Sequence, residues 1–254
     1  MYRIDLNCDI GEGFGIYSFG QDEELINLIT SANIACGFHA GDPNQMVKTV
    51  ELCLANDVAI GAHPGYPDLA GFGRRAMDLS YHDIKNMVLY QAGALTAVAK
   101  ALGGKVEHVK PHGALYNSAV NNMEIAAAVI DAVASLDGPA LVALAGSKLV
   151  RLAREKGLRI IQEGFADRSY KPDGSLLGRK FETSVITDPT GAAENVVRMV
   201  KENRIICHSG EEISVHVDTV CVHSDNRKAL EIIKEIRAAL YKNEIMLLKP
   251  SHEL

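Results

Sequence analysis

The chain has 254 residues, of which 47% are hydrophobic, and a net charge of −6 at pH 7. This length and hydrophobic content suffice for one sizeable core or for two small ones. The acidic balance, the absence of tryptophan and an aromatic content of only 6% argue against a protein that binds nucleic acids or anionic membranes.

The five cysteines are widely spaced, and none belongs to a Cys-x-x-Cys pair. An odd, unclustered set is typical of reduced thiols in a cytosolic protein. Met1 leads directly into the strand-like sequence YRIDLNCDI, which does not resemble a signal peptide. The longest apolar runs are too short to span a bilayer. We therefore expect a cytoplasmic protein with no membrane association.

Short apolar runs, which predict strands, alternate with amphipathic segments of helical period. In chain order, the strand and helix of each unit are predicted at 2–8 and 22–30, 32–38 and 43–57, 58–63 and 81–102, 106–112 and 122–136, 139–146 and 147–157, 159–166 and 189–203, and 218–224 and 226–242. Asp42-Pro43 and Asp188-Pro189 are typical helix starts, and Asp225 is expected to cap the last helix.

Strict alternation of strands and helices indicates an α/β fold with a parallel sheet and external helices. About seven such units in this length fit a (β/α) barrel, and no composition shift divides the chain, so a single domain over 1–254 is expected. A doubly wound open sheet is the alternative. The one long irregular stretch, 167–189, is expected to form a lid or binding loop.

Polar residues gather where the predicted strands end. Asp5, Asn7 and Asp9 are spaced by two and therefore share one face of the first strand. At or beyond the ends of later strands lie His39, His63, Lys110, His112, Glu163, Asp167, Arg168, His223 and Asp225. Parallel α/β proteins bind ligands at the carboxyl ends of their strands, so these groups predict one functional site.

Structural roles compete with this interpretation. Any single strand-end histidine can be a buried structural group, and Asp5 could form a buried ion pair with Lys110. Asp9, His39 and His63 could instead hold zinc or a similar ion, although their spacing is not a tight ligand motif. The sequence GEGFG at 11–15 is not a dinucleotide fingerprint, and the chain lacks a Walker A motif.

Six segments, in order along the chain, carry a resemblance to a known family: DLNCDIGEGFG, SANIACGFHAGDP, IGAHPGYPDLAGFGRR, VKPHGALYN, EGFADRSYKPDGSL and CVHSDN. Together they resemble the LamB/YcsF family. This resemblance implies a barrel of the kind seen in glycoside hydrolases and polysaccharide deacetylases. It also implies cleavage of 5-oxoproline (pyroglutamate) to L-glutamate coupled to ATP hydrolysis, within a complex that contains partner subunits B and C.

The segments that carry the resemblance also contain the candidate site residues, to which we assign roles on chemical grounds. The expected catalytic residues are Asp9, His39, His63, Lys110 and His112. The expected substrate-binding residues are Asp5, Asn7, Glu12, Asp167, Arg168 and His223. Within these sets, we hypothesise that Asp9 or a neighbouring histidine is the general base, that Lys110 stabilises developing negative charge, and that Arg168 binds the substrate carboxylate through two hydrogen bonds.

The sequence leaves several properties open. ATP would be a co-substrate handled largely by the partner subunits, and a divalent metal or a homo-oligomer is compatible with the sequence. Two other functions compete with a hydrolase that opens a cyclic amide. One is a metal-dependent deacetylase or amidohydrolase that uses Asp9, His39 and His63. The other is a non-catalytic scaffold that only binds a ligand.

Overall fold

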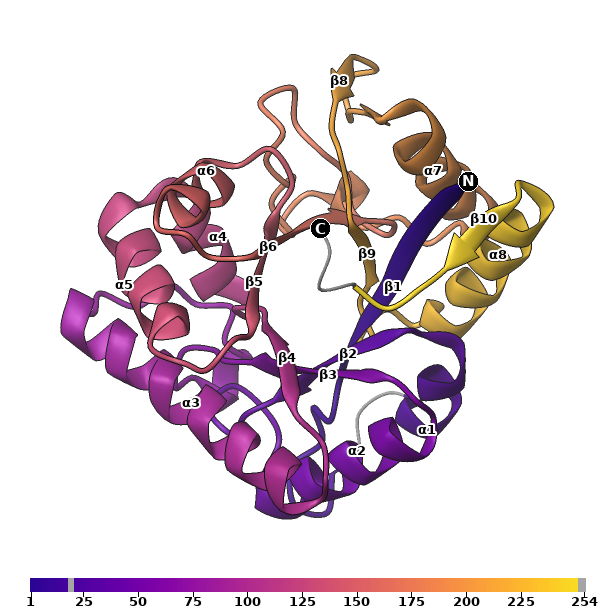
Figure 1. The fold of residues 1–254 in the computed structure, drawn as a ribbon. Coiled ribbons are helices and arrows are strands. Elements are labelled where there is room, and N and C mark those ends of the chain that lie inside the picture. The colour runs from indigo at the N-terminus through magenta and orange to yellow at the C-terminus, as the bar shows by residue number, and fades with distance from the viewer. Residues whose placement is uncertain (18–20, 251–254) are drawn as a thin grey trace.

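A barrel of seven parallel strands forms the centre of the molecule, in a computed structural model that describes residues 1–17 and 21–250. The strands follow the order β1-β2-β3-β4-β5-β6-β9, and β9 pairs with β1 to close the ring (Figure 1). Their bounds are β1 Tyr2–Ile10, β2 Ser31–Ala35, β3 Ala59–His63, β4 Val106–Val109, β5 Ala140–Leu144, β6 Ile160–Phe165 and β9 Thr219–Val222. The predicted (β/α) barrel is confirmed, and the open-sheet alternative is wrong.

Helices surround the strands on the outside of the ring (Figure 1). They are α1 Asp22–Leu25, α2 Pro43–Ala55, α3 Tyr81–Ala101, α4 Gly113–Asn121, α5 Met123–Ala134, α6 Lys148–Glu155, α7 Pro189–Glu202 and α8 Ala229–Lys242. The predicted segment 22–30 starts as α1 but continues as a 3-10 turn, Ile26–Leu28. Within the described residues, no helix is both long enough and apolar enough to cross a membrane.

One short α-helix and three short strands were not predicted. Helix α4 follows β4 without a strong apolar stripe, and its start is fixed by a hydrogen bond from the Ala114 amide to the Gly73 carbonyl. Strands β7 Arg204–Ile206 and β8 Glu212–Ser214 form an antiparallel hairpin. Strand β10, Ile245–Leu247, pairs with the first residues of β1. Strands of three residues are too short to show the period-2 pattern on which the prediction depends.

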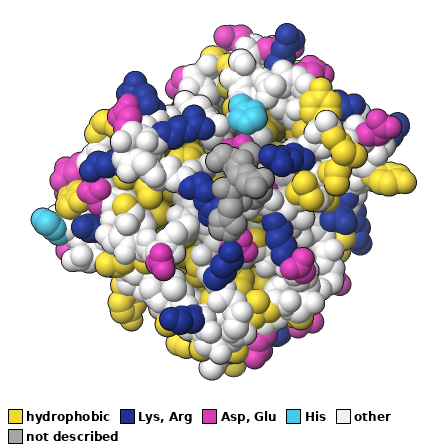
Figure 2. All heavy atoms as spheres, in the orientation of Figure 1, with side chains coloured by type: hydrophobic (Ala, Val, Ile, Leu, Met, Phe, Trp, Pro, Cys, Tyr) yellow, Lys and Arg dark blue, Asp and Glu magenta, His cyan; other side chains and the backbone are white. Residues whose placement is uncertain are grey.

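Strand β10 lies beside an apolar surface. Hydrophobic side chains gather over β10 and the end of α8 (Figure 2), where Tyr2 is 48%, Tyr241 88% and Met246 42% exposed. This surface lies at the start of β1, whereas the polar residues predicted to form a site lie at the other end of the strands.

Two of the three predicted helix caps are confirmed. Asp42 accepts hydrogen bonds from the amides of Asn44 and Gln45, and Asp188 accepts one from the Gly191 amide. The third is wrong, because α8 begins three residues later than expected and Asp225 instead forms an ion pair with Arg74.

The two faces of each barrel strand differ in character. On β1, Leu6, Cys8 and Ile10 face the helices and are fully buried, whereas Asp5, Asn7 and Asp9 face the barrel interior. The interior polar side chains of the neighbouring strands include Ser31, Asn33, His63, His108, Glu163 and Thr219. A small apolar cluster from β5 and β6, namely Ala140, Val142 and Ile161, completes the interior. This polar interior positions the groups at the barrel mouth.

Gly61 on β3 makes room for His108, a residue that the sequence analysis did not assign to the site. A Cβ atom at Gly61 would lie 1.9 Å from His108 Nε2. That nitrogen contacts Asn33 Oδ1 at 2.8 Å, and Asn33 in turn donates to the carboxylate of Asp9. Glycine is therefore required at position 61, because the His108 ring packs directly against its backbone inside the barrel.

We predict that Gly61→Ala destabilises the protein by about 1–3 kcal/mol, because the added methyl group overpacks the interior. The matched control is Gly93→Ala in α3, where a Cβ atom would meet open space and the change should stabilise the helix by about 0.5–1 kcal/mol. Urea unfolding of both variants measures the difference. Equal stabilities would show that His108 is not confined as described.

Asp5 is buried in the polar interior, farther from the cavity than Asn7 and Asp9 of the same strand. It accepts hydrogen bonds from Thr30 Oγ1 at 2.6 Å, Ser31 Oγ at 2.7 Å and Thr219 Oγ1 at 2.5 Å. The alternative structural role of Asp5, an ion pair with Lys110, is therefore wrong, since Lys110 pairs with Asp9 and Glu163. Burial raises the pKa of Asp5 to about 6, against the opposing effect of the three hydroxyl groups.

This shift predicts a pH-dependent stability. Because the folded protein binds the Asp5 proton more tightly than the unfolded chain does, the contribution is fully present below about pH 4 and is lost as the pH rises through about 6. Relative to Asp5→Asn, the wild type should lose about 3 kcal/mol of unfolding free energy between pH 4 and 7. Urea titrations at several pH values measure this, with exposed Asp137→Asn as control. Parallel curves for wild type and Asp5→Asn would contradict it.

Candidate active site

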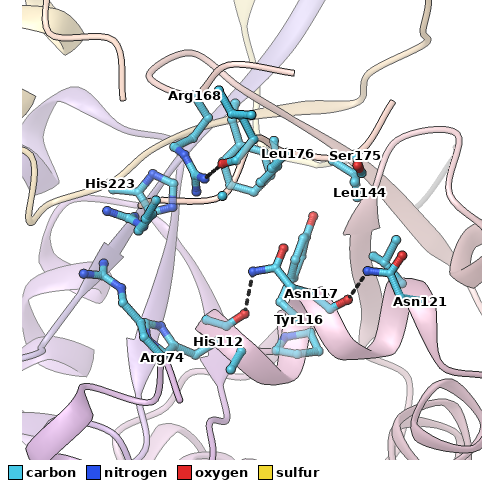
Figure 3. A pocket seen from close by; sticks show the side chains of 18 of the residues that line it. Arg74, His112, Tyr116, Asn117, Asn121, Leu144, Arg168, Ser175, Leu176 and His223 are labelled. Carbon is cyan, nitrogen blue, oxygen red and sulfur yellow. Dashed lines mark hydrogen bonds between the residues drawn. The ribbon is translucent and has the colours of Figure 1, made fainter. Parts of the chain in front are cut away.

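A cavity of about 470 Å³ opens where the barrel strands end. Figure 3 shows Arg74 and His112 on one side, Arg168 and His223 opposite them, and Tyr116 and Asn117 of α4 along the base. The loop after β6 contributes residues between Arg168 and Arg179, within the stretch expected to form a lid or binding loop. The volume lies in the range of small-molecule sites, which is about 300–1,000 Å³.

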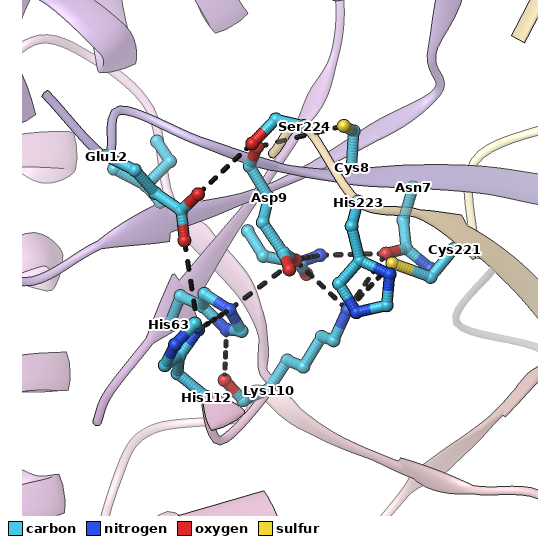
Figure 4. A network of polar contacts seen from close by, with 12 residues as sticks. Asn7, Cys8, Asp9, Glu12, His63, Lys110, His112, Cys221, His223 and Ser224 are labelled. Atoms are coloured by element: carbon cyan, nitrogen blue, oxygen red, sulfur yellow. Dashed lines mark hydrogen bonds and ion pairs between the residues drawn. The ribbon is translucent and has the colours of Figure 1, made fainter. Parts of the chain in front are cut away.

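Lys110 lies at the floor of this cavity with a buried, doubly paired ammonium group. Its Nζ is 2.8 Å from Glu163 Oε1. The same nitrogen is 3.0 Å from Asp9 Oδ1 and 3.1 Å from Cys221 Sγ (Figure 4). Burial alone would lower the pKa of Lys110, but the charges of Asp9 and Glu163 raise it well above the usual value. Lys110 is therefore a cation at neutral pH and not a proton acceptor.

Asp9 is the carboxylate held most firmly by its surroundings. Oδ1 accepts from Asn33 Nδ2 at 2.9 Å and from Lys110, and it lies 3.4 Å from His63 Nε2. Burial opposes ionisation, but the charges of His63 and Lys110 outweigh it and keep the pKa of Asp9 well below the usual range. An ionised carboxylate with such a low pKa is a weak base, which disfavours the expected role of Asp9 as general base.

His223 is oriented by Asp167. Its Nδ1 lies 2.9 Å from Asp167 Oδ1, and its ring stacks on Phe165 with centroids 5.3 Å apart. Burial raises the pKa of Asp167, but the charge and hydrogen bond of His223 reverse this and lower the pKa overall. The ionised carboxylate fixes a hydrogen on Nδ1, and the opposite edge of the ring points toward Lys110 and the cavity (Figure 4).

Three histidines and Glu12 converge at one wall of the cavity. The rings of His39 and His112 stack with centroids 3.7 Å apart, and His63 meets both edge-on. Glu12 Oε1 is 3.5 Å from His39 Nε2 and 3.8 Å from His112 Nδ1. Burial, followed by the neighbouring histidine charge, lowers the pKa values of His39 and His112, so both rings are neutral at pH 7.

The possible metal set differs from the one that the sequence suggested. The ligand atoms of Glu12, His39, His63 and His112 all lie within 4.8 Å of one another. Glu12 thus takes the place expected for Asp9, which belongs to a second group with Cys221 and His223. The sequence could not reveal this exchange, because Glu12 lies beyond β1 in a loop whose path depends on Gly11, at φ +74°.

Arg168 lines the cavity, and two of its five N–H donors are used within its own loop. Its Nε donates to the Ser184 carbonyl at 3.1 Å and its Nη2 to the Leu177 carbonyl at 2.7 Å, so its expected contact with a substrate carboxylate stays a prediction that would use the remaining donors. Arg74 and Arg179 line the same cavity, about one third exposed, and share the single carboxylate of Asp225. Sequence reasoning missed both, although Arg74 falls within a segment that carried the resemblance.

Asn7, expected to bind substrate, lies below the cavity floor with Asp5. Asn7 Oδ1 accepts from Asn33 Nδ2 at 2.8 Å, and its Nδ2 donates to Thr219 Oγ1 at 2.7 Å and Glu163 Oε1 at 3.1 Å. Asn7 therefore forms hydrogen bonds with Glu163 and Lys110 on the side of these groups that faces away from the cavity. Glu163, noted at a strand end but not assigned to the site, is fully buried and is the second partner of Lys110.

Comparisons with known proteins agree over almost the whole chain. The A subunit of a 5-oxoprolinase from Clostridium kluyveri is 50% identical over 255 residues, covering 100% of each chain. The crystal structure of a lactam utilization protein from Thermus thermophilus superposes with a TM-score of 0.92 at 44% identity, covering 97% of this chain and 99% of that one.

A more distant structure supports the fold alone. The family 4 carbohydrate esterase from Streptomyces lividans has a TM-score of 0.52 at 11% identity, covering 97% of this chain and 91% of that one. This likeness agrees with the expected deacetylase-type barrel and says nothing of activity. The model of the LamB/YcsF family matches residues 4–254, and the chain therefore belongs to the LamB/YcsF family.

Proposed function

We propose that this chain is the A subunit of 5-oxoprolinase and takes part in opening 5-oxoproline to L-glutamate, coupled to ATP hydrolysis, with partner subunits B and C. The observation that carries the proposal is the full-length match, at about half identity, to relatives named as the A subunit of 5-oxoprolinase. The comparisons favour neither the metal-dependent deacetylase nor the ligand-binding scaffold.

The charges around the cavity suit a small substrate with a carboxylate. Arg74 and Arg179 bring two guanidinium groups to the cavity, and Asp225 offsets only one positive charge. An excess cation of this kind favours a carboxylate through charge-assisted hydrogen bonds. In the proposal, Arg74 and Arg179 bind the carboxylate of 5-oxoproline and direct its lactam ring toward the cavity floor.

The chemistry requires activation, because a five-membered lactam is a resonance-stabilised amide with a poor leaving group. ATP would supply this by phosphorylating the lactam oxygen, which makes the ring carbon electrophilic. Water then adds to that carbon and the C–N bond breaks, while the nitrogen takes up a proton. This yields γ-glutamyl phosphate, and a second water releases phosphate and glutamate. Because the chain lacks a Walker A motif, the partner subunits handle ATP in this proposal.

His223 is the proposed general base. It lines the cavity, Asp167 holds its Nδ1 hydrogen, and the free Nε2 can accept a proton from the attacking water. Lys110 is already matched by two carboxylates, so in this proposal it positions Asp9 and Glu163 at the floor. The histidines of the cavity wall, His63 and His112, limit where the lactam ring can lie.

The first experiment reconstitutes the reaction. Purified chain, subunits B and C, 5-oxoproline and ATP are mixed, and glutamate and inorganic phosphate are measured. We expect both products in equal amounts, and only in the complete mixture. If the complete mixture, with subunits B and C present and folded, releases no glutamate, the proposed function is wrong.

The second experiment tests the base. In the reconstituted complex, His223→Gln should lower kcat by about 10²–10⁴-fold with little change in KM, because the variant keeps a polar group but cannot accept the proton. The control is His82→Gln, since His82 is exposed on α3 and should retain wild-type kcat. Wild-type turnover by His223→Gln would assign the base to another residue.

A further inference from the structure

We propose that Glu12, His39, His63 and His112 bind one divalent transition-metal ion, with zinc as the best match. The proposal concerns binding alone and does not depend on the proposed function. Three imidazoles and one carboxylate form a donor set typical of zinc. The hydrogen-bonding state of these side chains indicates that a cation, rather than a proton, completes the group.

The backbone determines which nitrogen of two histidines carries hydrogen. His63 Nδ1 lies 2.6 Å from the Lys110 carbonyl, and His112 Nε2 lies 2.8 Å from the Phe72 carbonyl. A carbonyl oxygen only accepts, so both of these nitrogens are N–H donors. When both rings are neutral, His63 Nε2 and His112 Nδ1 are therefore bare acceptors, and they face each other at 3.0 Å, with Asp9 Oδ1 3.4 Å from the same His63 nitrogen. Two lone pairs at this distance need a proton or a metal ion between them.

Other buried atoms of the group distinguish these two possibilities. Among the described residues, Glu12 Oε1 and both ring nitrogens of His39 are buried without a hydrogen-bond partner. Such atoms are rare in folded proteins because they lose their bonds to water. A proton shared by His63 and His112 would leave Glu12 Oε1 and His39 Nε2 unsatisfied. A metal ion would satisfy all four facing atoms together.

The distances fit a small tetrahedral site. Zinc bonds of about 2.0–2.1 Å place neighbouring ligand atoms roughly 3.3 Å apart in a tetrahedron. The separations here are 3.0 Å between His63 and His112, 3.5 Å between Glu12 and His39, and 3.8 Å between Glu12 and His112. The remaining separations are all within 4.8 Å. The rings of His39 and His112 are parallel to within 4° and would have to tilt toward each other for both nitrogen lone pairs to point at one ion.

The surroundings hold three of the four ligands, His63, His112 and Glu12, as they do in known metal sites. Ligating histidines usually donate their second N–H to a carbonyl or carboxylate, and here the Lys110 and Phe72 carbonyls accept those hydrogens. Ser224 Oγ donates to Glu12 Oε2 at 3.1 Å, which leaves Oε1 for the ion.

Two glycines let the loops close over the histidine rings. A Cβ atom at Gly65 would lie 2.7 Å from His39 Nδ1, and one at Gly73 would lie 2.7 Å from His39 Cβ and 2.8 Å from His112 Cδ2. The absence of a Cβ atom at these two positions thus lets the loops approach both rings closely. Four protein ligands complete a tetrahedral ion, so its role would be to fix His63 and His112 in the cavity wall rather than to activate water.

The experiment measures metal binding directly. The full chain is treated with a chelator, dialysed against Zn²⁺ or Co²⁺, and analysed for metal content and for the visible absorption of tetrahedral Co²⁺. We expect one ion per chain, the tetrahedral spectrum and a higher Tm in the presence of Zn²⁺. A wild-type chain that binds no stoichiometric ion would overturn the proposal, as would an imidazolium shared between His63 and His112 in ¹⁵N NMR spectra recorded with Zn²⁺ present.

Variants locate the ion. Glu12→Gln and His39→Gln should each weaken Zn²⁺ binding at least tenfold, with folding checked by circular dichroism in the absence of metal. His223→Gln removes a member of the second group, and His216→Gln removes an exposed histidine, so both should keep wild-type binding. Undiminished binding by folded Glu12→Gln and His39→Gln, or loss of the ion in either control, would contradict the assignment.

Discussion

The buried ammonium group of Lys110, held between Asp9 and Glu163, is the interaction on which the rest of the structure depends. Placing three charges inside a barrel has a large desolvation cost, and the pairing recovers it only with close contacts and further hydrogen bonds. Asn7 and Asn33 supply those bonds from beneath. Without Lys110, two carboxylates would remain buried with no ammonium group between them, and removing one partner of such a buried pair is strongly destabilising.

The buried ion pairs of Lys110 explain why the inner faces of most barrel strands are polar while their outer faces are apolar. Most (β/α) barrels fill their interior with branched apolar side chains, whereas here the apolar contribution comes mainly from β5 and β6. The stability of the barrel must therefore come largely from its outer layer, where Leu6, Cys8 and Ile10 of β1 pack against the helices with exposures of 1% or less. The outer layer supports an interior that is shaped by hydrogen bonds.

The features that could be predicted from the sequence are those that leave a regular repeat of residue types along the chain. Alternation of apolar runs and amphipathic helices predicted the parallel barrel, and the two-residue spacing of Asp5, Asn7 and Asp9 correctly predicted a shared face. The partners of these residues could not be predicted, because register between strands decides them: Asp5 meets Thr219, whereas Asp9 reaches Lys110. Loop residues were harder still, since Arg74 and Glu12 reach the site through backbone turns that leave no periodic signal.

Lys110 also connects the two halves of the site. Its side chain neutralises Asp9, while its backbone carbonyl accepts the Nδ1 hydrogen of His63 and so directs Nε2 toward the histidine group. His112, two residues later, presents Nδ1 to the same point. A displacement of the β4 end would therefore disturb the ion pairs and the histidine group together. Because the Lys110 cation at the cavity floor is already paired with two carboxylates, recognition of an anionic substrate falls to the more exposed arginines at the cavity.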